Sequence, residues 1–210
     1  MDARQDTQRN PYGMDEDCRN CPELADVRER VVHGYGDVGA DFVFVGDAPS
    51  ASAERTGVPF TGDEDGERFQ NILGHLGLNR SLPTSDEPEL ENAYLLYLAR
   101  CRHPDRDPTD DEIHACDAYL TADIRMINPE IIVPVGERAL REIATEYTTT
   151  PAAELSVDDH HAESIRGRGF ELVPMKHSGE MTDDEQEEFI THFLDLMDSD
   201  YRQTKGRRSR

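Results

Sequence analysis

The chain has 210 residues, with 45 Asp or Glu against 22 Lys or Arg, and its formal net charge is −23. This length suits one domain with a single core, and no apolar run approaches the ~20 residues of a membrane helix, which excludes a membrane-spanning protein. The acidic residues are spread along the whole chain, as expected of a surface adapted to molar salt, where the Debye length is about 3 Å, so we expect a halophilic source rather than a protein that avoids nucleic acid.

The N-terminal segment, residues 1–13, is polar and lacks the apolar stretch of a signal peptide. We therefore expect a cytoplasmic protein that does not bind membranes. Residues 1–200 are predicted to form one domain with an N-terminal metal-binding arm. A basic tail is predicted over residues 201–210, whose last nine residues carry five positive charges and no acid. Such a tail either contacts phosphates or is a disordered solubility tail.

Four apolar segments predict β-strands, and they cover residues 41–46, 93–99, 130–136 and 170–175. Their apolar residues are continuous and show little alternation, which is typical of parallel strands that are buried on both faces. Because ligands bind beyond the carboxyl ends of such strands, the turn after the first strand and the segment after the last are expected to line one crevice.

Helical patterns lie between and after the strands, over residues 64–76, over 110–127, after Gly136 and from Thr182 onward. Two of these helices begin with a capping box, Thr109 with Glu112 and Thr182 with Glu185. Segments 79–92 and 147–164 are predicted to be exposed loops. The alternation predicts a three-layer α/β/α fold with a central, mainly parallel four-stranded sheet.

Four cysteines suggest a metal site. Cys18 and Cys21 form a C-x2-C pair, Cys101 follows the second predicted strand, and Cys116 lies on a predicted helix. Disulfides are disfavoured in a cytosolic protein. Four thiolates fit either tetrahedral zinc or an iron-sulfur cluster, and the spacing alone does not choose, although the split second pair is less typical of a zinc ribbon.

Several motifs occur in an order that resembles family 4 uracil-DNA glycosylases. They are the C-x2-C pair, the Gly-acid-Ala-Pro turn (46–49), TGVPFTG (56–62), RCRHPDRDPTDDEIHAC (100–116), INPEIIVPVG (127–136), an Arg-Gly-Arg (166–168) and a His after the last strand. The resemblance implies hydrolysis of the N-glycosidic bond of uracil, or of another deaminated base, that has been flipped out of DNA. We expect single-stranded DNA or a damaged duplex as the partner, and a monomer.

The resemblance also implies the cofactor and the catalytic groups. Its cysteine positions imply a [4Fe-4S] cluster on Cys18, Cys21, Cys101 and Cys116, with zinc as the alternative. His177 would donate a hydrogen bond to the carbonyl of the leaving base, and Asp47 would position the attacking water.

The remaining predicted contacts are with the base and the phosphates. Phe60 would stack on the base, and the turn formed by Gly46, Ala48 and Pro49 would supply backbone amides and pocket surface. Arg166 and Arg168 would hold phosphates.

Three positions depart from the family pattern. Tyr97 replaces the Asn that would pair with the amide edge of uracil, Ser50 replaces a Gly, and no proline follows His177. A phenol cannot offer the donor and acceptor of an amide together, so Tyr97 is predicted to line or partly fill the pocket. Three functions follow: a glycosylase with altered base preference, a catalytically silent relative that binds DNA or a protein and keeps its cluster, and a hydrolase of nucleosides or nucleotides.

Overall fold

The computed structural model describes residues 7–201, and a six-stranded sheet forms its centre. The strands are β1 (Tyr35–Gly36), β2 (Phe42–Gly46), β3 (Ala93–Tyr97), β4 (Ile131–Pro134), β5 (Ile165–Arg166) and β6 (Glu171–Leu172), arranged in the order β1-β3-β2-β4-β6-β5. The inner four strands are parallel, as predicted, whereas β1 and β5 pair antiparallel at the two edges. The predicted count of four strands was therefore too low, because the two-residue edge strands β1 and β5, unlike β6, do not lie in a continuous apolar run.

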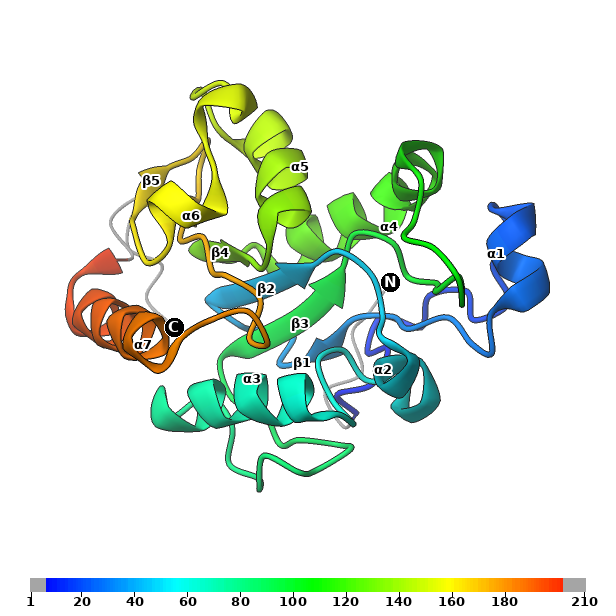
Figure 1. Cartoon of the computed structure of the whole chain (residues 1–210), viewed down its shortest axis with the longest axis horizontal. Helices are drawn as coiled ribbons and strands as arrows, with labels where there is room; N and C mark the ends of the chain where they lie inside the picture. The colour runs from blue at the N-terminus through cyan, green and yellow to red at the C-terminus, as the bar shows by residue number, and fades with distance from the viewer. Residues whose placement is uncertain (1–6, 202–210) are drawn as a thin grey trace.

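The helices alternate with the strands (Figure 1). They are α1 (Pro22–Val27), α2 (Ala51–Thr56), α3 (Glu64–His75), α4 (Asp110–Ile127), α5 (Glu137–Tyr147), α6 (Val157–His160) and α7 (Asp183–Asp198), with a short 3-10 helix at Ala152–Glu154. The structure confirms the four predicted helices and both capping boxes. Segment 147–164 was predicted to be a loop, but it contains α6 and the 3-10 helix.

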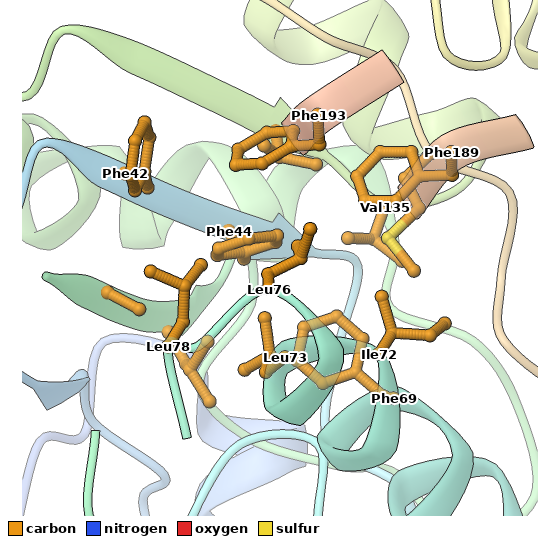
Figure 2. Packing of buried hydrophobic residues seen from close by; sticks show 14 of the residues in the cluster. Phe42, Phe44, Phe69, Ile72, Leu73, Leu76, Leu78, Val135, Phe189 and Phe193 are labelled. Carbon is orange, nitrogen blue, oxygen red and sulfur yellow. The ribbon is translucent and has the colours of Figure 1, made fainter. Parts of the chain in front are cut away.

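Two hydrophobic layers explain why the strand sequences are continuously apolar. Phe42 and Phe44 point to one face of the sheet, where they pack with residues of α3 and α7, including Phe69 and Phe193 (Figure 2). Val43 and Val45 point to the other face and pack with residues of α4 and α5. All five residues of β2 are buried. The chain is therefore the predicted three-layer α/β/α structure.

The order of the strands creates a crevice at one end of the sheet. The chain leaves β2 toward α3 on one face, and it leaves the neighbouring β4 toward α5 on the other face. Because these two connections run to opposite faces of the sheet, they leave an opening beyond the carboxyl ends of β2 and β4. Ligands bind at such openings in open α/β sheets. Within residues 7–201, no helix is long and apolar enough to cross a membrane.

Candidate functional site

A groove of about 1700 Å³ lies beyond the carboxyl ends of the parallel strands. Asp47 and its turn follow β2, and His177 comes from the segment after β6. Phe60 and Tyr97 also line this groove. The groove therefore brings together residues that lie up to 130 positions apart in sequence, as the positions of the strand ends predicted.

Phe60 lies at the tip of the turn between α2 and α3. Its ring stacks on Phe69, with ring centroids 4.3 Å apart and an interplanar angle of 19°. Its backbone has φ 56°, which is uncommon for a bulky side chain. A Cβ atom on Gly46 would lie 2.7 Å from the ring of Phe60, so only glycine at position 46 allows this close approach. The ring thus has one face covered by Phe69 while the residue lines the groove.

Tyr97, at the end of β3, is only 4 % exposed. Its hydroxyl accepts a hydrogen bond of 2.9 Å from the backbone N–H of Phe60. Burial raises the pKa of the phenol, so the hydroxyl stays protonated at neutral pH. Tyr97 therefore fills space beside the groove, and its hydroxyl binds the main chain of the aromatic turn.

His177 and Asp47 form a charged pair in the groove. His177 Nε2 lies 3.9 Å from Asp47 Oδ2, which is an ion-pair distance rather than a hydrogen bond. The interaction with the Asp47 carboxylate raises the pKa of His177, although burial acts in the opposite direction. Asp47 Oδ1 is buried and accepts no hydrogen bond from any side chain or backbone group in the described part of the chain.

The turn after β2 is anchored by Ser50. Its side chain accepts from the N–H of Ala53 and so caps α2, and its hydroxyl donates to Asp63 Oδ2 at 2.8 Å. The serine that replaces the family glycine therefore has a local structural role. Ala48 and Pro49 line the groove beside it.

Arg166 and Arg168 lie away from the groove. Both side chains are exposed, on and just after β5. Arg166 pairs in register with Glu171, which pairs with Ile131 at the start of β4. The Arg-Gly-Arg hairpin therefore lies at the amino ends of the strands, opposite the groove, and its contact with DNA stays a prediction.

The four cysteines gather beside the loop that follows β3. Cys21 caps the start of α1, Cys101 follows β3, and Cys116 lies in α4. Burial raises the pKa of Cys21 to about 11 and that of Cys101 to about 12, and in each case the neighbouring thiols act in the same direction. Buried thiolates are therefore costly here without a cationic partner, and a metal would provide one.

Two arginines stabilise this region. Arg28 faces Cys101 and donates to the backbone carbonyl of Cys18, and its charge lowers the pKa of Cys101 against the effect of burial. Arg100 forms a fully buried ion pair of 2.6 Å with Asp123 of α4. The thiols thus lie in a partly cationic environment. No three His, Cys, Asp or Glu side chains in residues 7–201 lie close enough to hold one metal ion.

The sequence analysis missed Arg102 and Arg106, which line the groove. Both lie between Cys101 and Cys116 in the 100–116 motif. The motif itself was recognised in the sequence, but only its cysteines were assigned a role. Arg106 forms two hydrogen bonds of 2.8 Å with the Glu112 carboxylate of α4, which lowers the pKa of Glu112 to about 2. Arg102 lies 4.0 Å from the buried Glu54.

Comparison with known proteins identifies the fold family. Residues 33–196 match the family model described as the uracil DNA glycosylase superfamily. The chain is 34% identical over 137 residues to the type-4 uracil-DNA glycosylase of Archaeoglobus fulgidus, covering 63% of each protein. It is 28% identical over 179 residues to the type-5 uracil-DNA glycosylase of Pyrobaculum aerophilum, covering 76% of this chain and 77% of that one.

A third relative, the type-4 uracil-DNA glycosylase of Thermotoga maritima, is 36% identical over 124 residues, or 59% of this chain and 58% of the relative. The matches to the two type-4 relatives thus span less than two thirds of those proteins. The family model, by contrast, covers most of this chain, including all four inner strands. The chain belongs to the uracil DNA glycosylase superfamily.

Proposed function

We propose that the protein is a DNA base-excision repair glycosylase that hydrolyses the N-glycosidic bond of uracil or another deaminated base. The observation that carries this proposal is the presence of Phe60 and His177 in one groove, at the carboxyl ends of the parallel strands. An aromatic ring can stack on an extruded base, and an imidazole can stabilise the charge that develops as the base leaves.

His177 is the group we assign to the leaving base. When the glycosidic bond breaks, negative charge collects on the base and positive charge on the sugar. A raised pKa keeps His177 protonated to higher pH than usual, and the imidazolium has two N–H donors. Nε2 faces Asp47, so Nδ1–H is the donor that we assign to the base carbonyl. This interaction is strongest in the transition state, as catalysis requires.

Asp47 is the group we assign to the attacking water. One of its carboxylate oxygens faces His177, and the other is buried without a protein donor. The Asp47 side chain is 29% exposed although Oδ1 is buried, so a water molecule in the groove reaches the carboxylate at Oδ2. The same carboxylate would then place the water near the sugar and favour the positive charge that develops there.

The four cysteines would hold a [4Fe-4S] cluster. Zinc would draw all four sulfurs to about 2.3 Å from a single ion, whereas a cluster offers a separate iron to each thiolate. The resemblance of the cysteine positions to those of family 4 enzymes supports the cluster, and the neighbouring thiols that raise the pKa of Cys21 and Cys101 support a shared metal site. When bound, it would join the N-terminal arm, the loop after β3 and α4 into one unit beside the groove. Iron and sulfide analysis of the purified protein tests this, and one zinc ion per chain would contradict it.

The glycosylase proposal is tested by incubating the protein with oligonucleotides that carry uracil, hypoxanthine or xanthine, in high KCl. We expect the free base in solution and an abasic site in the strand. The matched control is the same oligonucleotide with thymine at the lesion position. Binding of DNA without release of any of the three bases would contradict the proposal and favour the silent relative.

A further inference from the structure

The backbone of Phe60 is held at both of its polar groups by buried side chains. Tyr97 accepts from its N–H at 2.9 Å, and Gln70 Nε2 donates to its C=O at 3.1 Å. Asn79 in turn donates to Gln70 Oε1 at 3.0 Å. Tyr97, Gln70 and Asn79 are 4 %, 0 % and 7 % exposed, so these hydrogen bonds are shielded from water. The three side chains come from β3, α3 and the segment after α3, and we refer to them as the Phe60 clamp.

The conformation of Phe60 explains why a clamp is needed. A φ of 56° is a left-handed backbone conformation that a bulky residue keeps only where its surroundings hold it. Neither of its backbone hydrogen bonds belongs to a helix or strand. Because the ring stacks on Phe69 at 4.3 Å, rotation of the Phe60 backbone would move the ring out of this stack and away from its place in the groove.

We propose that the clamp positions Phe60 for base stacking, and that Tyr97 acts through Phe60 rather than by reading the edge of the base. The proposal rests on the proposed function, which it deepens. It also accounts for the tyrosine at position 97, where the family pattern has Asn, because its hydroxyl oxygen already accepts a hydrogen bond from the Phe60 N–H. Tyr97, Gln70 and Asn79 are thus positioning residues.

The first test measures hydrogen exchange at the Phe60 amide and needs no enzymatic activity. The wild-type amide is expected to be protected, and Tyr97→Phe to increase its exchange rate by about tenfold or more, because the substitution removes the hydroxyl that accepts from this amide and keeps the ring. Tyr94→Phe is the matched control: Tyr94 is a buried tyrosine of the same strand that interacts with Asp123 in the other layer. An unprotected wild-type amide, or equal effects of the two substitutions, would overturn the clamp.

The second test is a double-mutant cycle on kcat/KM for base release. Tyr97→Phe is expected to lower kcat/KM about tenfold in the wild type but less than twofold in Phe60→Ala. If Tyr97 acts only by positioning the Phe60 ring, its hydroxyl has no effect on kcat/KM once that ring is removed. Equal losses in both backgrounds would mean that Tyr97 acts on the substrate directly, and would overturn the proposal. Gln70→Met, which removes the other hydrogen bond at similar volume, supplies a second cycle should Tyr97→Phe not fold.

Failure of the proposed function can be told apart from failure of the clamp. If the wild type releases no base, the glycosylase proposal fails, and the cycle is measured instead as the Kd for an oligonucleotide with 2′-fluoro-2′-deoxyuridine, compared with its thymidine counterpart. A preference for the uracil analogue that Tyr97→Phe weakens in the wild type, but does not weaken further in Phe60→Ala, supports the clamp. Absence of that dependence, or an unprotected Phe60 amide, overturns it.

Discussion

Two residues, Gly136 and Asp47, determine the position and the charge of the His177 side chain. Gly136, with φ 94°, lies directly against the imidazole, and any larger residue there would collide with the ring. Asp47 raises the pKa of His177 by favouring the charged form, while burial opposes it. The imidazolium is therefore present below its raised pKa and is lost as the pH rises through it. Base release that depends on this donor must fall on the alkaline side of that pKa.

Asp47→Asn should move the alkaline limb of the kcat profile to lower pH, because burial then acts on His177 without the opposing carboxylate. We also expect a lower maximum rate, since Asp47 is assigned to the water as well. Asp158→Asn is the control, because this acid borders the groove but interacts with Lys176. An alkaline limb at the same pH in wild type and Asp47→Asn would show that His177 does not control the rate.

The helix α4 connects the metal site to the groove. Its N-terminus carries a capping box of Thr109 and Glu112, and the same Glu112 accepts from Arg106 in the groove wall. Because the pKa of Glu112 is lowered from 4.5 to about 2, its contribution to stability is complete above pH 4.5 and is lost as the pH falls toward 2. Cys116 lies on the same helix, two turns after the cap.

Thr109→Ala should cost about 1 kcal/mol of folding stability, as the loss of an N-cap does. Thr182→Ala is a matched control, because it removes an equivalent capping box from α7, which carries no cysteine. We expect similar changes in unfolding free energy but faster loss of iron to a chelator from Thr109→Ala only. Equal rates of iron loss from the two variants would show that the stability of α4 does not affect the metal site.

The sequence predicted the inner strands, the long helices and both capping boxes because each has a strong local signal. It did not predict β1, β5 or α6, which have two to four residues and depend on tertiary contacts. At the site, the strand ends predicted that the turn after β2 and His177 line one groove, and the family resemblance added Phe60. The partner of the Tyr97 hydroxyl could not be predicted, because this hydrogen bond depends on how the turn after α2 folds back over β3.

The whole molecule carries a net charge of −23, and its groove is acidic as well. Most groove cations are already paired: Arg106 with Glu112, Arg138 with Asp110, and Lys176 with Asp158 and Glu185. A phosphate backbone therefore meets few unpaired positive charges within the groove. Long-range repulsion between the protein and DNA should weaken as salt screens it. The predicted basic tail could compensate, but residues 202–210 lie outside the described part of the chain.

Raising KCl from 0.1 M to 2 M should stabilise the protein, because screening reduces repulsion among the acidic side chains. We expect Tm to rise by about 5 °C or more, the equivalent of roughly 2 kcal/mol for a chain of this size. Thermal unfolding followed by circular dichroism measures this, with an uncharged osmolyte at the same osmolality as the control. A Tm that does not change with KCl, or that rises equally in the osmolyte, would contradict the electrostatic explanation.

The central claim is that the groove shared by Phe60 and His177 breaks the bond between base and sugar. Single-turnover release of uracil from a single-stranded oligonucleotide in 2 M KCl tests it most directly, with wild type beside His177→Ala. We predict free uracil from the wild type and a rate about a hundredfold lower from the variant, as for the loss of one donor to a developing anion. His75→Ala, an exposed histidine of α3, should match the wild type. Equal rates for wild type and His177→Ala would contradict the account.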